Sequence, residues 1–303
     1  MQSAANTRFL LNMLSLQSLS LLALLGGTYA SFHDFAFRET AHAFFHPVLP
    51  GHETSPSPVY AFLVEHKNTR LMFDLGIRKD TVNFVPSVAA SFASGAFILN
   101  QSKDITELLQ DGGVPLKSID TSFGAIDYFG DGSFYLLNTP GHLLGHMSAL
   151  ARVTPTSFVS LGGDAFAHAG QIRPRPAFQK NFPCPAHLLE ETASSISTDY
   201  FWSPHSRDGV FDMRSRAQQL LAISDVPDAF YVDPVAAQVS LDKLAVFDAD
   251  PDFFVVIAHD MSLVGSLPYF PASLNGWKAS GLKERTVWNF ANEANPAFVF
   301  SPA

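Results

Sequence analysis

The 303-residue sequence is poor in cysteine and in charge. Its single cysteine, Cys184, forms no internal disulfide and excludes metal sites built from several thiolates. Charged residues make up 16% of the chain, and 28 acidic residues outnumber 19 basic ones, which leaves a formal net charge of −9. Because a negative field repels phosphates and no basic run interrupts it, we expect no nucleic-acid partner.

Several catalytic signatures are also absent. No G-x-S-x-G nucleophile elbow occurs, which disfavours serine-hydrolase chemistry. Neither G-x-x-x-x-G-K-[ST] nor G-x-G-x-x-G is present, which disfavours nucleotide chemistry. The chain does have 11 histidines beside its one cysteine. This balance indicates imidazole and carboxylate ligands if a metal is bound.

The N-terminal segment has the composition of a targeting signal. Residues 9–32 carry no charged side chain, and Arg8 precedes them. A positive charge, an apolar stretch and small residues predict a secretory signal cleaved before Ser31. Polar interruptions and leucines on one helical face leave an amphipathic or extraneous segment as the alternative, and they disfavour a membrane anchor. The protein is therefore secretory if residues 1–30 are a signal peptide, and otherwise cytoplasmic.

The rest of the chain predicts one domain over residues 31–303, because no linker, repeat or low-complexity tract divides it. Its 28 phenylalanines indicate an aromatic core. Strands that alternate with helices favour a layered α/β architecture. Strands are predicted at 59–64 and 70–75, which form a hairpin, and at 133–137, 158–161 and 253–257; helices are predicted at 102–110, 212–223 and from Asp233 onward.

Three predicted strand-to-loop junctions each present a side chain of the metal-ligand type. His142 follows a Thr-Pro-Gly turn, Asp164 follows two glycines, and His259 follows the strand 253–257. Strand ends hold the backbone rigidly and glycines let the loops approach closely, so these side chains are expected to project into one cleft. Imidazole and carboxylate suit zinc, on which a bound water can become hydroxide near neutral pH.

The order of these motifs resembles the metallo-β-lactamase superfamily. The run Phe73-Asp74-Leu75-Gly76, the Pro-Gly-His turn with His146 four residues after His142, the Gly-Asp pair at Asp164 and Ala-His-Asp at His259 are similar to its lactonase-like branch. This branch includes fungal relatives of the acyl-homoserine lactone hydrolases, and the resemblance runs from about residue 44 to 291. It implies an αββα sandwich, an α/β fold, with a dinuclear zinc site on one edge.

The resemblance also implies roles for individual residues. His142 would ligate the first zinc ion, Asp164 would bridge both ions, and His259 would ligate the second. Asp74 would support the ligands or organise its own loop, and His146 is expected to support the site rather than to ligate.

Two further residues are weaker candidates. His168 is predicted either to line the cleft or to lie on the surface. Arg173, in a run that resembles a pocket-edge loop of the same branch, would meet a carboxylate or carbonyl of the substrate.

One segment departs from the family pattern. The motif H-x-H-x-D-H, which supplies two ligands to each zinc ion, should follow Ile119-Asp120 after one more strand, but no His-x-His pair occurs in the chain. The sandwich is therefore predicted to be incomplete by one strand and one loop. Two, one or no zinc ions all remain open, as do Asp127, Asp131 and His168 as substitute ligands.

The resemblance implies metal-dependent hydrolysis of a small-molecule ester or lactone by zinc-bound hydroxide. The aspartate of the missing motif, which would carry the proton, is absent, so weak activity is the most that this chain is expected to show. Two alternatives stay open. One is a thioesterase on acyl-carrier substrates, and the other is a catalytically inactive relative that serves as a binding module.

Overall fold

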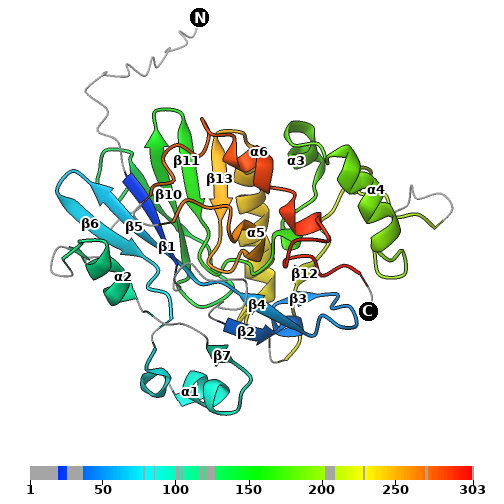
Figure 1. The fold of residues 1–303 in the computed structure, drawn as a ribbon, viewed down its shortest axis with the longest axis horizontal. Coiled ribbons are helices and arrows are strands. Elements are labelled where there is room, and N and C mark those ends of the chain that lie inside the picture. Colours follow the sequence, from blue (N-terminus) through cyan, green and yellow to red (C-terminus); the bar gives the residue numbers. More distant parts are fainter. Residues whose placement is uncertain are drawn as a thin grey trace, which may run out of the picture.

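A computed structural model describes most of the chain. The described residues are 20–25, 37–77, 79–84, 86–99, 103, 105–115, 119–120, 127–201, 209–227, 229–269 and 272–301. Two four-stranded sheets face each other at the centre of the molecule (Figure 1), with the strand orders β1-β5-β6-β8 and β13-β11-β10-β9.

The strands of both sheets are mainly antiparallel. The first sheet contains β1 (Ser20–Leu25), β5 (Tyr60–His66), β6 (Thr69–Phe73) and β8 (Ile119–Asp120). The second contains β9 (Phe134–Asn138), β10 (Met147–Thr154), β11 (Ser157–Leu161) and β13 (Phe253–Val256). The pairs β6–β8 and β11–β13 are parallel, which requires long crossover connections outside the sheets.

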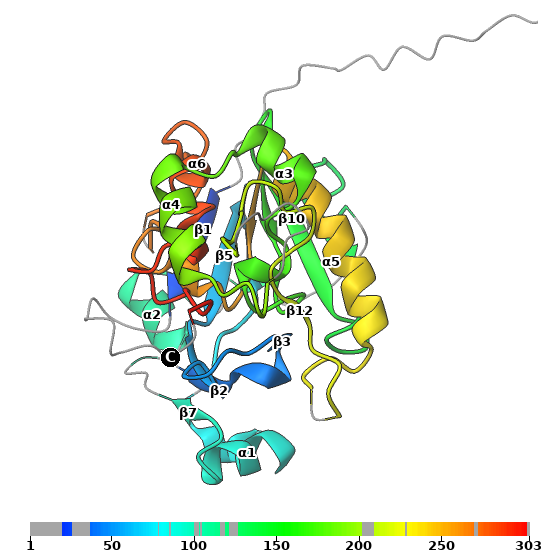
Figure 2. The same ribbon diagram turned by 90° about the vertical axis from the view of Figure 1, so that its right-hand side faces the viewer.

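Both faces of the first sheet are buried, and β5 shows why. Its side chains alternate between the two faces: Phe62 packs with Phe254 of the second sheet between the layers, whereas Leu63 packs with Leu109 of α2 (Ile105–Asp111) on the outside. The second sheet is covered by α5 (Pro234–Ala249), whose buried side chains pack on those around β13. Figure 2 shows α2 and α5 on opposite sides of the sheets. The predicted αββα sandwich is confirmed.

Smaller elements surround the sandwich. A three-stranded sheet is formed by β2 (Phe37–Thr40), β4 (Thr54–Ser57) and β7 (Ile98–Leu99), and a two-stranded one by β3 (Phe45–His46) and β12 (Ala222–Ile223). The remaining helices are α1 (Pro86–Ala93), α3 (Pro176–Asn181), α4 (Ala186–Ser195) and α6 (Leu282–Thr286). Many of the phenylalanines lie in a core cluster around α3, α4 and the C-terminal segment, as the aromatic composition predicts.

Most of the predicted elements are confirmed, with one clear error. The hairpin β5–β6, the strands β9, β11 and β13 and the helix that begins at Asp233 lie where they were expected. The predicted helix 212–223 is wrong. Asp212 Oδ1 accepts the N–H of Arg214 in a tight turn, and Gln179 Nε2 donates to the carbonyls of Met213 and Arg216, which a helix would have used internally.

Part of the predicted signal segment belongs to the first sheet. Residues 20–25 form the edge strand β1, which pairs antiparallel with β5 from Ser20–Glu65 to Leu25–Tyr60. Cleavage before Ser31 would remove this strand, so a signal peptide and a native β1 exclude each other in the mature protein. The rest of the predicted segment lies outside the described residues, and the localisation stays a prediction. No helix within the described ranges is long and apolar enough to cross a membrane.

Candidate functional site

Three strand ends deliver the three predicted ligands to one edge of the second sheet. His142 lies between β9 and β10, Asp164 follows β11, and His259 follows β13. The turn before His142 packs directly on α5, where a Cβ on Gly141 would lie 2.2 Å from the backbone of Ala237. Only glycine fits there, and its φ of +137° also favours glycine. The Thr-Pro-Gly sequence therefore places His142 against the start of α5.

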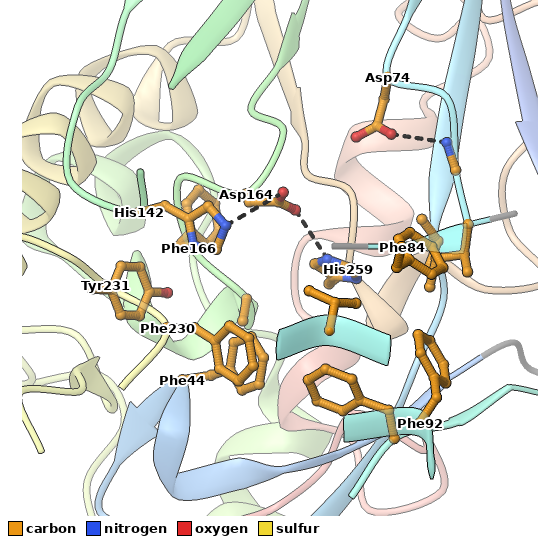
Figure 3. A pocket seen from close by; sticks show the side chains of 16 residues that line it. Phe44, Asp74, Phe84, Phe92, His142, Asp164, Phe166, Phe230, Tyr231 and His259 are labelled. Carbon is orange, nitrogen blue, oxygen red and sulfur yellow. Dashed lines mark hydrogen bonds and ion pairs between the residues drawn. The ribbon is translucent and has the colours of Figure 1, made fainter. Parts of the chain in front are cut away.

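The three side chains meet at the carboxylate of Asp164 (Figure 3). His259 Nε2 lies 3.0 Å from Oδ1 of Asp164, and His142 Nε2 lies 3.7 Å from Oδ2. The two imidazoles thus approach different oxygens of one carboxylate. We call His142, Asp164 and His259 the Asp164 cluster.

The contact between His259 and Asp164 is incomplete as a hydrogen bond. Nδ1 of His259 lies 2.8 Å from the carbonyl oxygen of Pro58, which can only accept, so Nδ1 carries a proton. In the neutral ring Nε2 then presents a lone pair to Oδ1 of Asp164, which is buried and accepts no hydrogen bond. A second proton on His259, or a cation between the two atoms, makes this contact favourable.

Burial and charge act against each other at both His142 and Asp164, and the pKa of each group lies below its ordinary value. Burial lowers the pKa of His142, against the attraction of Asp164, so this ring is neutral near pH 7. For Asp164, burial alone would raise the pKa, but contact with His259 and the charges of the neighbouring histidines outweigh it and hold the pKa below its ordinary value. Asp164 is therefore an anion between two imidazoles.

His146 and Asp74 shape the loops around the cluster. His146 Nδ1 donates to the carbonyl of Thr139 at 2.9 Å, and Nε2 accepts the backbone N–H of Asp164 at 3.0 Å, so both ring nitrogens are used in positioning the Asp164 loop. Oδ1 of Asp74 accepts the N–H groups of Leu75 and Gly76 at 2.7 and 2.9 Å and stabilises a turn in which Asp74 itself has a φ of +65°. Burial and the nearby charge of Asp164 raise the pKa of Asp74.

The cluster opens into a cavity of about 230 Å³. One side of the cavity is polar and contains the Asp164 cluster and Asp74, while the other side is apolar. Phe44 and Phe230 stack there with ring centroids 4.6 Å apart, and Phe97 contacts Phe230 at 5.5 Å. The apolar side chains come from several elements: Phe44, Val59, Ile77, Phe84, Val88, Phe92, Phe97, Phe166, Ala167 and Phe230.

His168 and Arg173 lie elsewhere, so both expectations for them need correction. His168 is 5% exposed and caps the turn at residues 169–171: Nδ1 accepts the N–H of Gly170, and Nε2 lies 2.7 Å from the carbonyl of Ala297. It neither lines the cavity nor lies on the surface. Arg173 is 3% exposed and pairs with Asp248 through two hydrogen bonds of 2.8 and 2.7 Å. It does not contact the cavity either.

The residues considered as substitute ligands are also engaged away from the cavity. Asp131 binds His66 and Lys67 at 2.8 and 2.9 Å and accepts a hydrogen bond from Ser133. Asp127 accepts the N–H groups of two glycines in the loop before β9. Neither lines the cavity.

The sequence reasoning missed Tyr231, which lies beside the cluster. Its ring centroid is 6.0 Å from that of His142, at an angle of 81°, and it lines the cavity next to Phe230. The backbone holds it there, because Val232 donates its N–H to the carbonyl of His142. Tyr231 lies just before Asp233-Pro234, which predicts the start of a helix. Nothing in this local pattern indicates that Tyr231 belongs to the site.

The donor types suit a divalent cation, but their number does not suit the dinuclear zinc centre that the resemblance implies. Within the described ranges, no group of three or more histidine, cysteine, aspartate or glutamate side chains is arranged to hold a metal ion. A catalytic zinc ion usually has three protein ligands. Asp164 offers each of two ions one oxygen beside a single imidazole. The residues present therefore do not fit a two-ion centre.

The proteins to which this chain is similar belong to a hydrolase family. No protein-family model matches the sequence. The chain is 30% identical to the gamma-lactamase FDB1 of Fusarium pseudograminearum, over 84% of this chain and 79% of that protein. It is 27% identical to the metallo-hydrolase mfmC of Annulohypoxylon moriforme, over 84% of this chain and 83% of that protein. These alignments run over 333 and 332 positions, more than the chain has residues, so both relatives carry segments without a counterpart here.

The fold is similar to that of an N-acyl homoserine lactone hydrolase solved with the product N-hexanoyl-L-homoserine at its catalytic metal center. The TM-score is 0.52 at 16% identity, covering 84% of this chain and 99% of that one. At such identity the likeness concerns the fold alone.

Proposed function

Because this chain belongs to the metallo-β-lactamase superfamily, in its lactonase-like branch, we propose that it hydrolyses the ring ester or ring amide of a small lactone or lactam at the Asp164 cluster. One observation carries the proposal: an apolar cavity ends at a carboxylate held between two imidazoles. The names of the relatives suggest that both cyclic amides and cyclic esters should be tested.

The cavity favours a small, mostly apolar substrate. Its volume of about 230 Å³ lies below the usual range for ligand pockets, which begins near 300 Å³. The stacked rings of Phe44 and Phe230 offer flat apolar surface for the carbon skeleton, and they exclude water from it. A compact ring compound fits this space better than the long acyl chain of a carrier-bound thioester.

His142 is placed to move the proton of the reaction. Its neutral ring has Nε2 directed toward Asp164 at the cavity wall. When a water attacks the ring carbonyl, Nε2 takes a proton from that water and returns it to the leaving oxygen or nitrogen as the ring bond breaks. Asp164 stabilises the imidazolium that forms in between.

Zinc-bound hydroxide, the nucleophile of the family, is not assigned to these residues, because their ligand set is incomplete. Catalysis without it depends on the proton transfer and on substrate positioning. General acid–base catalysis contributes about 10²- to 10⁴-fold, so turnover is expected to be slow.

The experiment is a panel of five-membered lactones and lactams, including an acyl-homoserine lactone, with ring opening followed by chromatography. The wild type should open at least one ring faster than buffer, and Asp164→Asn should lose that activity. Asp242→Asn is the matched control, since Asp242 is an exposed carboxylate on α5 outside the cavity. Equal rates for wild type, Asp164→Asn and buffer contradict the proposal.

A second function, binding without turnover, is favoured by the incomplete ligand set. A relative that has lost catalysis keeps the apolar wall and the anion of Asp164 as a recognition site. Saturable binding of an intact lactone by the wild type, with no ring opening over days, supports the binding module over the hydrolase.

A further inference from the structure

A second cavity lies beside α3, away from the Asp164 cluster. Its volume is about 500 Å³, within the usual range for ligand pockets. Its wall is formed by α3, by Pro183 and Cys184 after it, and by the loop 214–216. Among the described residues, none lines both cavities. The cavity at the Asp164 cluster is lined in part by α1, which lies at the opposite end of the molecule from α3 (Figures 1 and 2). We call the second one the α3 cavity.

The α3 cavity is lined by three cations, Lys180, Arg214 and Arg216, and its described lining contains no aspartate or glutamate. Burial raises the pKa of the Cys184 thiol to about 12, so this side chain adds no negative charge. The chain as a whole has a formal net charge of −9 and repels anions. The α3 cavity is therefore a local concentration of positive charge, which attracts them.

Two of the cations, Lys180 and Arg214, are exposed, and neither has an ion-pair partner within the described part of the chain. The charge of Arg214 acts against the rise of the Cys184 pKa, which indicates that its guanidinium lies close to the thiol. Arg175, the residue before α3, differs from them because it is paired with Asp242. Lys180 and Arg214 therefore have donors to offer to a ligand.

The loop that carries Arg214 is fixed to α3. Nε2 of Gln179 donates to the carbonyls of Met213 and Arg216, both at 3.2 Å. Oδ1 of Asp212 accepts the backbone N–H of Arg214 at 3.0 Å. Because the backbone on both sides of Arg214 is held, a ligand at its side chain has less conformational freedom to remove on binding.

Arg216 contributes a positive charge at a fixed position. Its guanidinium donates at 3.2 to 3.4 Å to the backbone carbonyls of Phe201, Gln218 and Gln219. Its Cζ lies 5.7 Å from the centroid of the Phe211 ring. Burial lowers the pKa of Arg216, as expected for a cation withdrawn from water. An anion in the α3 cavity would offset this cost.

The donor types suit a phosphate group. Guanidinium and ammonium groups bind phosphate through short, charge-assisted hydrogen bonds. A phosphate monoester carries about 1.5 to 2 negative charges near pH 7, which three cations balance better than they would balance one carboxylate. The volume of about 500 Å³ leaves room for an organic group beside the phosphate, and Pro176 and Pro183 give the wall an apolar part for it.

We propose that the α3 cavity binds a small phosphate monoester, with Lys180 and Arg214 as direct partners of the phosphate and Arg216 as a fixed charge beside them. The site is separate from the Asp164 cluster. Binding there holds or fails whether or not the protein opens a lactone ring.

The test is calorimetric titration of the full chain at constant ionic strength with glucose 6-phosphate, phenyl phosphate, inorganic phosphate and acetate. We expect one ester molecule per chain, and at least one ester should bind about tenfold or more tightly than inorganic phosphate. Lys180→Gln and Arg214→Gln should each weaken binding at least about tenfold, because each removes a charged partner. Lys243→Gln, which removes an exposed lysine on α5, is the matched control and should change nothing.

Lys180, Arg214 and Lys243 are all exposed, so the variants should fold, and thermal melting without ligand checks this. No binding of either ester at millimolar concentration overturns the proposal. Inorganic phosphate that binds as tightly as both esters, or affinity unchanged in Lys180→Gln and Arg214→Gln, indicates an adventitious ion only and overturns it. Acetate that binds as tightly as phosphate overturns the choice of phosphate. An equal loss of affinity in Lys243→Gln shows that the attraction is not specific to the α3 cavity and also overturns it.

Discussion

Two groups of charged and titratable side chains lie at opposite ends of α5 and differ in their burial and in how well their polar atoms are paired. The Asp164 cluster lies near the start of the helix. At the other end, Arg173, Asp248 and Lys283 form what we call the Arg173 cluster. Asp248 there is 1% exposed, against 34% for Asp164.

In the Arg173 cluster each charged side-chain nitrogen and oxygen atom has at least one partner. Arg173 holds Asp248 through two hydrogen bonds and donates a third to the carbonyl of Val287. Lys283 donates to the carbonyls of Asp248, Asp250 and Phe253 at the end of α5 and the start of β13, where a cation also meets the negative end of the helix. In the Asp164 cluster, by contrast, the buried Oδ1 of Asp164 lies 3.0 Å from Nε2 of His259 without a well-formed hydrogen bond. Complete satisfaction indicates a structural role, and an unmet acceptor at a cavity indicates a site for a ligand.

The largest effect on stability is expected from removing Arg173 from the Arg173 cluster. Arg173→Ala leaves Asp248 as an unpaired buried charge, and removal of one partner of a buried pair costs about 3–5 kcal/mol. The free energy of unfolding, measured by urea denaturation, should fall by this amount. A loss below about 1 kcal/mol would mean that the cluster is not structural.

His168, buried outside both groups, makes stability depend on pH. Burial lowers its pKa from 6.5 to about 4. The unfolded chain therefore binds a proton near pH 6.5 that the folded chain binds only near pH 4. His168 contributes stability above pH 6.5 that is lost as the pH falls toward 4, by about 3 kcal/mol in total.

The measurement is the difference in unfolding free energy between wild type and His168→Gln across this pH range. The wild type should lose its advantage between pH 6.5 and 4. A difference that stays constant with pH would refute the assignment of His168 to the core.

Asp164→Asn should have the opposite profile to Arg173→Ala. The substitution keeps the side chain's shape and removes a charge that is 34% exposed, so the free energy of unfolding should fall by less than the amount expected for Arg173→Ala. Ring opening should fall by roughly 100-fold or more, because the imidazolium loses its counter-charge. Denaturation and activity are measured on the same preparation. A large loss of stability would place Asp164 among the structural charges.

The smallest effect is expected at an exposed ion pair that otherwise resembles Arg173–Asp248. Nη2 of Arg175 lies 2.8 Å from Oδ1 of Asp242, and the side chain of Asp242 is 52% exposed. Arg175→Ala should cost about 0–1 kcal/mol, because water screens the pair. Urea denaturation beside Arg173→Ala tests whether burial, rather than the pairing of charges, sets the size of the effect.

Much of the fold could be predicted because its signals are local. The β-rich runs around Asn68 predict the hairpin, and Asp233 before a proline predicts α5, where Asp233 Oδ1 accepts the N–H of Ala236. The helix predicted from Asp212 failed because a capping residue is equally suited to a turn, and distant Gln179 takes the carbonyls that a helix needs.

The residues of the candidate site, like the elements of the fold, could be predicted only where their signals are local. The motif order predicted that His142, Asp164 and His259 lie close together. Each follows a strand of the second sheet, and the ends of these three strands lie at the same edge. His168 and Arg173 carry no such signal, and their roles depend on partners far along the chain, Ala297 and Asp248.

The sequence by itself determined the superfamily, the strands β5, β6, β9, β11 and β13 and the three side chains of the Asp164 cluster, since these follow from short patterns in a fixed order. Only the tertiary structure decided which charges are satisfied. The carbonyl that orients His259 belongs to Pro58, 201 residues away, and the aromatic wall of the cavity joins Phe44, Phe97 and Phe230 from separate segments. Whether a buried polar atom finds a partner depends on how such segments meet, and no local pattern encodes that meeting.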